Sequence, residues 1–365
     1  MSEIKPTSTA LIAMSGGVDS SVAAYLIKKT DMDAIGCTMK LYDNEDADIP
    51  KENTCCSLDD IEDARNVATR LGMPYYVFNF KDDFKEKVID NFISCYECGM
   101  TPNPCIECNR YLKFNKLLER AQELHCDYVV TGHYARIEET PEGFVLKKAV
   151  DDSKDQSYVL YSLTQEQLKH TLFPLGELTK VEARSIAEEN GFVNANKPDS
   201  QDICFVPDGD YASVIAHYTG KEYLPGNYVS TTGEVLGQHK GIIHYTIGQR
   251  KGLGIALGEP RFVCRIDPER NEVVLGTNEE LMTHDVHVEN FNWILGKAPC
   301  DVGESFKCTA RIRYKHKEQN AEVLVNDDGS VDVRFEDKIR AATPGQSCVL
   351  YDGDIVLGGG KIVIK

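Results

Sequence analysis

Four cysteines in NFISCYECGMTPNPCIECNRYLKF, residues 91–114, form a dense group of side chains that could do chemistry. Cys95, Cys98, Cys105 and Cys108 make two CxxC pairs separated by six residues. Thiolates at such spacing bind a metal, exchange disulfides or carry sulfur in a reaction. The spacing alone favours a metal. Six intervening residues, two of them proline, are few for two zinc knuckles to face one ion, so the rest of the chain must decide.

A second chemical group is MSGGVDSS, residues 14–21, which has the composition of an anion-binding loop. Gly16 and Gly17 allow backbone N–H groups to turn toward an anion, and a helix that starts here adds its positive end. Ser15, Ser20 and Ser21 supply further donors. The loop holds no lysine and lacks the GxxxxGK[ST] pattern, so it does not indicate transfer of a γ-phosphate.

The elements that must position this loop alternate over the first two hundred residues. Apolar runs predict strands, and amphipathic runs predict helices, which together indicate a parallel sheet covered by helices. The loop then follows the first strand, at the edge where open α/β sheets bind ligands. Ser57 and Gly72 mark the ends of one helix, and Thr179 and Glu182 are spaced as a capping box. The predicted strands are 9–14, 34–40, 74–80 and 127–137, and the helices are 20–29, 57–72, 114–124 and 179–191.

From about residue 220 the pattern changes to short alternating runs separated by glycines, which predicts two small all-β, barrel-like domains. Asp328-Gly329 lies between two such runs and predicts a hairpin. The predicted fold is therefore an α/β, Rossmann-like nucleotide domain followed by two β domains. The predicted boundaries are 1–218, 219–290 and 291–365.

Composition limits the class of protein. With 42% hydrophobic and 27% charged residues, the chain of 365 residues is typical of a folded protein. The run TALIAM is too short for a signal peptide, so we expect the thirteen cysteines to be reduced thiols in the cytoplasm. The formal charge of −18 argues against a general nucleic-acid coat.

One segment of this acidic chain is strongly basic. KCTARIRYKHK, residues 307–317, holds five Lys or Arg and no acid. As a strand it would place Arg311, Arg313, Lys315 and Lys317 on one face, either to meet phosphates or as a solvated surface.

The hexapeptide SGGVDS resembles the pyrophosphate (PP) loop, SGGxDS, of the ATP-pyrophosphatase superfamily. That resemblance implies cleavage of ATP between its α- and β-phosphates, adenylation of a carbonyl oxygen, and a role for Asp19 with magnesium and phosphate. It also implies that Met39 lies near adenine. The nucleotide-binding residues that it implies are Ala13, Met14, Ser15, Gly16, Gly17, Val18, Asp19, Ser20, Met39 and Gly132.

Longer blocks narrow the resemblance. TPNPCIECNRYLKF, VVTGHYARI, KPDSQDICFV, GIIHYTIGQRKGLGI and TPGQSCVLYDGD resemble the tRNA-specific 2-thiouridylases, from residue 11 to about residue 355. This family places sulfur on C2 of the wobble uridine of tRNA, with sulfur delivered by a donor protein. The family pattern NPxxxCN makes Cys108 one catalytic cysteine. The pattern DSxxxCF makes Cys204 the persulfide carrier.

The same resemblance implies a set of tRNA contacts. Many relatives carry Asp where this chain has Cys105, so the role of Cys105 is open. Arg250 and Lys251 of the TIGQRKGL segment extend the basic track. The implied contacts are Asn103, Pro104, Cys105, His133, Lys154, Asp155, Gln156, Arg313, Tyr314 and Gln346.

Two thiols and a phosphate loop suffice for the chemistry, because adenylation turns the uridine oxygen into a leaving group and a persulfide is a strong nucleophile. Cys108 then releases the sulfur or resolves Cys204 as a disulfide. Alternatives are an iron–sulfur cluster on Cys105, Cys108 and Cys204, a small-molecule ligase or amidase of the superfamily, and a zinc-stabilised RNA-binding protein. The vicinal pair Cys55-Cys56 is assigned a structural role. The cysteines expected in cores are Cys37, Cys126, Cys264, Cys308 and Cys348.

Overall fold

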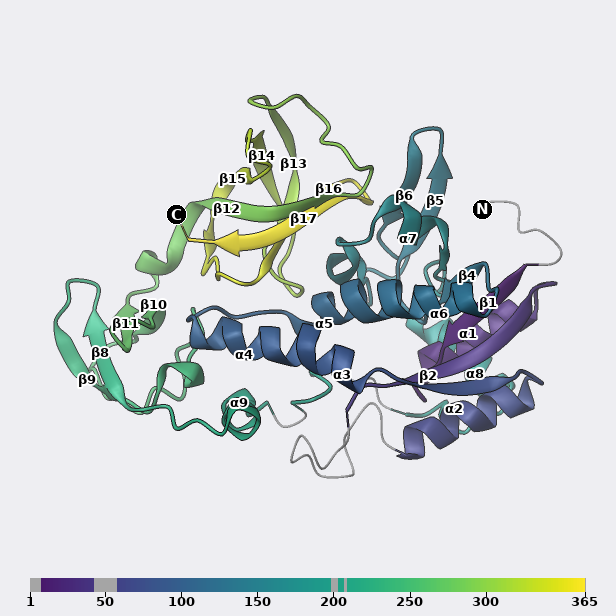
Figure 1. The fold of residues 1–365 in the computed structure, drawn as a ribbon. Helices are drawn as coiled ribbons and strands as arrows, with labels where there is room; N and C mark the ends of the chain where they lie inside the picture. The colour runs from purple at the N-terminus through teal and green to yellow at the C-terminus, as the bar shows by residue number, and fades with distance from the viewer. Residues whose placement is uncertain (1–7, 43–57, 198–202, 207–208, 365) are drawn as a thin grey trace.

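A parallel sheet forms the centre of the N-terminal region in the computed structural model, which describes residues 8–42, 58–197, 203–206 and 209–364 (Figure 1). The strand order is β3-β2-β1-β4-β7, and every neighbouring pair is parallel. Two apolar clusters cover the two faces of this sheet. The strands are β1 (Thr9–Ala13), β2 (Asp33–Lys40), β3 (Tyr75–Asn79), β4 (Tyr128–Val130) and β7 (Thr171–Leu172).

Three of the predicted helices are confirmed: α1 (Val18–Lys28), α2 (Leu58–Arg70) and α8 (Lys180–Glu189). Thr179 and Glu182 form the predicted capping box of α8. Gly72 follows α2 with a φ of +64°, a conformation that glycine adopts without strain. The predicted cap Ser57 lies outside the described residues.

Two boundaries of the predicted elements are wrong. Residues 127–137 are not one strand, because β4 ends at Val130 and β5 (Arg136–Thr140) joins another sheet. The helix predicted from residue 114 begins earlier, as α5 (Pro104–Glu107) and a nine-residue π-helix, η2 (Cys108–Lys116), before α6 (Leu117–Glu123). The remaining helices of this region are α3 (Lys81–Phe84), the π-helix η1 (Lys85–Ile89), α4 (Asp90–Glu97), the 3-10 helix η3 (Ser157–Leu160) and α7 (Gln165–Lys169).

The middle region is a four-stranded sheet with the order β10-β11-β8-β9, preceded by α9 (Tyr211–Thr219). Its core holds Tyr228, Val263, Val273 and Leu275, all fully buried. Its strands are β8 (Gly226–Ser230), β9 (Val235–His239), β10 (Phe262–Asp267) and β11 (Glu272–Gly276), with the 3-10 helices η4 (Ile242–His244) and η5 (Glu279–Leu281) beside them.

The C-terminal region is a closed antiparallel barrel, because β12 pairs with β17 as well as with β15. Asp328-Gly329 joins β14 to β15, which confirms the predicted hairpin. The barrel strands are β12 (Met282–Trp293), β13 (Ser305–Arg311), β14 (Gln319–Val325), β15 (Val331–Arg340), β16 (Ser347–Asp352) and β17 (Ile355–Val363).

A hairpin of the first region extends the barrel sheet. β5 pairs with β6 (Gly143–Lys147), and β6 pairs with β17 through Lys147↔Ile355 and Leu146↔Val356. The N-terminal and C-terminal regions therefore share one sheet and are held in a fixed orientation. Within the described residues, no helix is both long and apolar enough to cross a membrane.

Candidate active site

The segment between β1 and α1 is the predicted phosphate-binding loop. Gly16 has a φ of +76°, and a side chain at this position would overlap the backbone of Asp60. Gly17 caps α1 without a side-chain hydrogen bond, and its carbonyl accepts the hydroxyls of Ser20 and Ser21, each at 3.0 Å. The loop therefore stands at the positive end of an eleven-residue helix, which favours a bound anion.

Asp19 is held by two residues from distant elements. The ammonium of Lys180, at the first turn of α8, lies 2.7 Å and 2.8 Å from the two carboxylate oxygens of Asp19. The hydroxyl of Tyr134 donates to one of these oxygens at 2.8 Å. Lys180 is buried. It therefore places a lysine beside the loop, although the loop sequence itself contains none. Lys180 was not among the residues predicted from the motifs. A cation at a helix N-terminus is electrostatically unfavourable. The position of Lys180 at the start of a predicted helix was therefore a signal that its charge pairs with an acidic group elsewhere.

The segment that leads toward Cys204 is attached to the same loop. Asn194 is buried, and its side-chain amide donates to the Gly16 carbonyl and to the Ser21 hydroxyl, each at 2.9 Å. Lys197 pairs with Asp60 at 2.5 Å. Because Asp60 also contacts Gly16, the phosphate loop, α2 and this segment form one polar cluster.

Two further predicted nucleotide residues lie at the same edge of the sheet. Gly132 follows β4 and approaches the backbone of Asp19 and Ser20 so closely that a Cβ would lie 2.8 Å from it. Met39 lies near the end of β2, paired with Phe78. The structure therefore gathers the predicted nucleotide residues at the carboxyl ends of β1, β2 and β4, where such sheets bind ligands.

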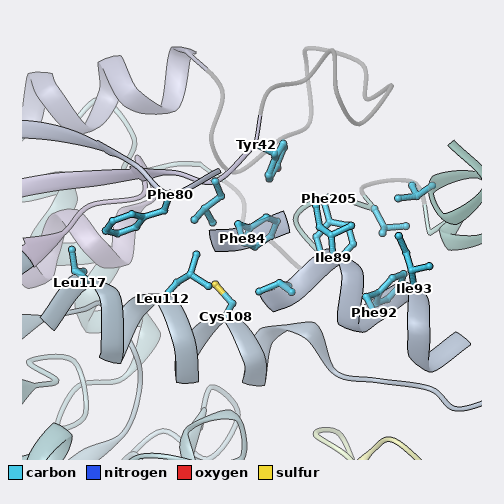
Figure 2. Packing of buried hydrophobic residues seen from close by; sticks show 14 of the residues in the cluster. Tyr42, Phe80, Phe84, Ile89, Phe92, Ile93, Cys108, Leu112, Leu117 and Phe205 are labelled. Carbon is cyan, nitrogen blue, oxygen red and sulfur yellow. The ribbon is translucent and has the colours of Figure 1, made fainter. Parts of the chain in front are cut away.

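Cys108 begins the π-helix η2 and points into an apolar cluster (Figure 2). Burial raises the pKa of its thiol to about 11, while Lys113 lowers this pKa and Cys105 raises it. The thiol is therefore protonated near neutral pH in this arrangement.

Cys204 packs against the same cluster as Cys108. It is half-buried, its neighbour Phe205 is buried in that cluster, and the Tyr42 hydroxyl donates to the Cys204 carbonyl at 2.6 Å. Phe205 contacts Phe84 and Phe92 edge to face, as the labelled rings in Figure 2 illustrate. The fold thus brings the two predicted catalytic cysteines, 96 positions apart, to one apolar cluster.

Cys105 is exposed at the start of α5, three residues before Cys108. Asn103 caps this helix, its side-chain oxygen accepting the Cys105 N–H at 3.1 Å, and Pro104 occupies the first helical position. Asn followed by Pro is a strong signal for the start of a helix. It places Cys105 in the first turn of α5.

The barrel holds the chain just before this helix. The Thr101 N–H donates to the Pro344 carbonyl at 2.9 Å, and the Gln346 side chain donates to the Thr101 carbonyl at 2.8 Å. Buried Glu107, between Cys105 and Cys108, pairs with Lys361 of β17 at 2.8 Å. The C-terminal region is thus part of the site's framework.

The described cysteines are not grouped as metal ligands. Across the residues that the structure describes, no three His, Cys, Asp or Glu side chains are grouped to hold a metal ion. Cys95 and Cys108 are buried, whereas Cys98 and Cys105 are exposed. Neither the zinc set nor the iron–sulfur set considered from the sequence is formed. Of the cysteines expected in cores, Cys37, Cys126 and Cys348 are buried, and Cys264 and Cys308 are half-buried against cores. Cys55 and Cys56 lie outside the described residues.

The predicted tRNA contacts of the first region differ in surroundings. His133 is buried one residue after Gly132. Lys154 is half-buried, whereas Asp155 is buried and accepts from the Ser157 hydroxyl at 2.9 Å. The side-chain oxygen of Gln156 accepts the Tyr134 N–H at 2.9 Å.

The basic segment 307–317 is not a continuous strand. β13 ends at Arg311, and the following Ile312 is buried. Arg311 bonds Glu318 and Asp155, so its charge is neutralised inside the protein. The predicted single face of four cations is therefore wrong, because the strand ends at Arg311 and the carboxylates of Asp155 and Glu318 pair with Arg311.

The other predicted contacts of the β regions are more accessible. Arg313 is half-buried and donates to the Arg340 carbonyl at 2.6 Å, while Tyr314 is exposed. Arg250 and Lys251 are exposed in the middle region.

Family models match the three regions in turn. The tRNA methyl transferase HUP domain matches residues 8–208, the tRNA methyl transferase PRC-barrel domain residues 212–277, and the aminomethyltransferase beta-barrel domain residues 283–362.

Similar proteins cover nearly the whole chain. The tRNA-specific 2-thiouridylase MnmA of Lachnoclostridium phytofermentans is 51% identical over 97% of this chain and 99% of its own length. The MnmA of Clostridioides difficile is 50% identical over 96% of this chain and 97% of its length. MnmA 1 of a Thermoanaerobacter species is 51% identical over 99% of this chain and 100% of its length.

Proposed function

The chain belongs to the tRNA-specific 2-thiouridylase family, and on that premise we propose that it adenylates O2 of the wobble uridine and then replaces this oxygen with sulfur. As a member of this family it is a tRNA sulfurtransferase that forms 2-thiouridine. The observation that supports the proposed mechanism is that Cys108 and Cys204 pack in one apolar cluster with Leu11 and Ala13 of β1, the strand that leads into the phosphate loop.

In the activation step, uridine O2 attacks the α-phosphorus of ATP, and the bond to pyrophosphate breaks. The groups that we propose to face the departing pyrophosphate are the backbone of Gly16 and Gly17, the start of α1 and the Lys180 ammonium beside Asp19. These groups stabilise the negative charge that develops on the leaving phosphates. Asp19 and the serine hydroxyls are chemically suited to a hard cation such as Mg²⁺, which would neutralise phosphate charge when bound.

In the sulfur step, the terminal sulfur of a Cys204 persulfide attacks C2, and AMP leaves. Cys108 then attacks the Cys204 sulfur, which releases 2-thiouridine and leaves a disulfide between the two cysteines. A reductant reopens this disulfide, and a donor protein supplies new persulfide sulfur. The shared apolar cluster supports this pairing, because both side chains already pack against it.

The site positions that we propose for tRNA are the uridine contacts Asn103, Pro104, Cys105 and His133, with Lys154, Asp155 and Gln156 beside them. Arg313, Tyr314, Gln346, Arg250 and Lys251 extend this track. We also retain as proposals the domain boundaries 1–218, 219–290 and 291–365, although β12 crosses the second of these. A cytoplasmic location follows from the substrate, since tRNA modification requires access to tRNA.

A single experiment separates the proposed steps. Purified enzyme with ATP, unmodified tRNA and a persulfide donor should release pyrophosphate and form 2-thiouridine. Asp19→Ala should abolish pyrophosphate release yet bind tRNA with nearly unchanged affinity. Pyrophosphate release at the wild-type rate from Asp19→Ala would remove the phosphate-loop mechanism, and turnover of ATP without any tRNA requirement would favour a small-molecule ligase.

A further inference from the structure

Asn194 reaches the phosphate loop from the segment that follows α8. Its side-chain amide donates to the Gly16 carbonyl and to the Ser21 hydroxyl, each at 2.9 Å, which lie 178 and 173 positions away along the chain. Asn194 is only 2% exposed, and its neighbours Phe192 and Ala195 pack in the apolar cluster that also contains residues of α1. Packing and hydrogen bonding therefore hold this amide at the buried side of the loop.

The partners of the Asn194 amide fix its orientation. A carbonyl oxygen only accepts hydrogen bonds, so the NH₂ group of Asn194 must face Gly16. The side-chain oxygen of Asn194 is then buried, and it has no hydrogen-bond partner among the described residues. A buried oxygen without a partner costs free energy. Asn194 is thus a poor choice for stability alone, which indicates that its amide has a task at the loop.

This task concerns the peptide group between Gly16 and Gly17. In a trans peptide the C=O and the N–H point in opposite directions. Asn194 holds the Gly16 carbonyl on its own side, so the Gly17 N–H points to the opposite side. Gly16 is buried, whereas Ser15 is exposed and Gly17 half-buried, so the side opposite Asn194 is the accessible side of the loop. No described residue accepts a hydrogen bond from the Gly17 N–H. This donor is therefore available to an anion, together with the N–H groups at the start of α1.

Two adjacent glycines make this peptide easy to reverse. Glycine adopts positive and negative φ with little steric cost, and Gly16 already has a φ of +76°. The hydroxyls of Ser20 and Ser21 hold the next peptide group, because each donates to the Gly17 carbonyl at 3.0 Å. For the Gly16 carbonyl, the side chain that donates is Asn194. Without that bond, a reversed peptide would present an oxygen to the anion in place of an N–H.

We propose that Asn194 is a positioning residue that directs the Gly17 N–H at the phosphates of ATP by holding the Gly16 carbonyl on the buried side of the loop. This inference rests on the proposed function, because it takes ATP as the ligand of the loop. α8 and the segment after it then serve the loop twice, since Lys180 pairs with Asp19 and Asn194 fixes the first peptide group. The contribution of Asn194 should concern the phosphates and not the nucleoside.

Nucleotide binding to the full-length enzyme tests this without turnover. α,β-Methylene ATP, which cannot be cleaved between its α- and β-phosphates, is compared by calorimetry and ligand-detected NMR with adenosine, which has no phosphate. Asn194→Leu keeps the approximate size of the side chain and removes its donors. It should bind α,β-methylene ATP about 10- to 100-fold more weakly than the wild type, as expected for one lost hydrogen bond to a charged group, and adenosine equally well. Equal losses for both ligands, or no loss for α,β-methylene ATP, would overturn the proposal.

Asn194→Asp tests the same contact through pH and decides the question if Asn194→Leu does not fold. A carboxylate has no donor, whereas a protonated carboxyl offers one O–H to the Gly16 carbonyl. Burial beside a carbonyl raises the pKa of a carboxyl group, so the binding deficit relative to the wild type should shrink between about pH 8 and about pH 5.5. A deficit that is the same at both pH values, or no deficit at either, would contradict the proposal.

Asn190→Leu provides the matched control. The Asn190 amide donates to the Ile186 carbonyl within α8 at 2.8 Å and not to the loop. This variant should bind both ligands as the wild type does. A loss of α,β-methylene ATP binding as large as that of Asn194→Leu would show a general effect of altering this segment and would contradict a specific role for Asn194.

Crystal structures with α,β-methylene ATP show the peptide directly. In the wild type the Gly17 N–H should lie within hydrogen-bond distance of a phosphate oxygen, and in Asn194→Leu the peptide should be reversed or present in both orientations. A Gly16 carbonyl that faces the phosphates in the wild type would overturn the inference. Normal pyrophosphate release by both proteins would remove this inference alone, whereas a wild type that binds no ATP analogue would refute the proposed function as well.

Discussion

Lys180 and Asp19 form an ion pair with distances of 2.7 Å and 2.8 Å, although 161 positions separate them in the chain. The pair joins the first turn of α8 to the phosphate loop, and Lys180 is buried there. A lysine that is absent from the loop sequence is thus supplied by another helix. In the proposed ATP complex, phosphates and a cation engage Asp19, and the ammonium already beside it reduces the reorganisation that binding needs.

Lys180→Met should therefore damage the ATP step more than any other. Loss of one charged phosphate contact of this kind costs about 2–4 kcal/mol, so kcat/KM for ATP should fall by about two orders of magnitude or more. Pyrophosphate release at varied ATP measures this, and tRNA binding should change little. Lys169→Met, an exposed lysine at the end of α7, is the control and should behave as wild type. Equal loss in both variants would contradict a specific role for Lys180.

Cys108 and Cys204 should behave differently from the exposed Cys98. Cys108→Ser and Cys204→Ser should lose 2-thiouridine formation while retaining pyrophosphate release, because a hydroxyl neither carries nor resolves a persulfide. Cys98→Ser, at an exposed position, should keep full activity and stability. Nucleoside mass spectrometry and pyrophosphate assays decide this. A loss of several kcal/mol of folding stability in Cys98→Ser, with zinc in the wild-type protein, would instead indicate a structural metal.

The reactivity of Cys108 should depend steeply on pH. Burial raises the pKa of its thiol to about 11, so the thiolate is a minor form near neutral pH. Because the group is protonated below this pKa, its alkylation rate should rise about tenfold per pH unit from about pH 7 to about pH 10. Peptide mass spectrometry after brief iodoacetamide treatment measures the rate. A rate that is flat above about pH 8 would show that the thiol is activated by groups other than Lys113.

The ion pair between Glu107 of α5 and Lys361 of β17 should contribute to folding stability. Lys361→Met leaves the buried Glu107 carboxylate without its partner, which costs about 1–3 kcal/mol after allowance for the partly exposed lysine. Glu107→Gln removes the charge and should recover part of that loss in the double variant. Denaturant unfolding of the four proteins gives the coupling energy. Strictly additive effects would mean that the pair contributes nothing.

Local patterns predicted much of this fold. The phosphate loop, α1, α2 and the capping box of α8 each depend on residues within a few positions, so their signals are present in the sequence. The π-helix η2 was not predictable in this way. Its residues also suit an α-helix, and no local pattern in the sequence specifies the wider turn.

Long-range pairing explains the other differences. The β5–β6 hairpin joins β17 across more than two hundred positions, and no local signal specifies that partner. For the site, the motifs predicted Cys108, Cys204 and the loop, whereas Lys180 and Asn194 were not predicted because their partners lie far away in the sequence. The alternating pattern of segment 307–317 predicted one strand. Such a pattern cannot show that Glu318 and Asp155 pair with Arg311.

That segment should therefore divide into a structural and a phosphate-binding part. Arg311 is ion-paired inside the protein, whereas Lys315 and Lys317 are exposed. Lys315→Met and Lys317→Met, if these lysines meet tRNA phosphates, should each lower the slope of log affinity against log salt by about one. Arg311→Met should instead reduce folding stability and leave the slope unchanged, because its charge already has two carboxylate partners. Titrations of tRNA at several salt concentrations, together with thermal unfolding, distinguish these effects. A slope that falls only in Arg311→Met would reverse this assignment and place the phosphate contact at the end of β13.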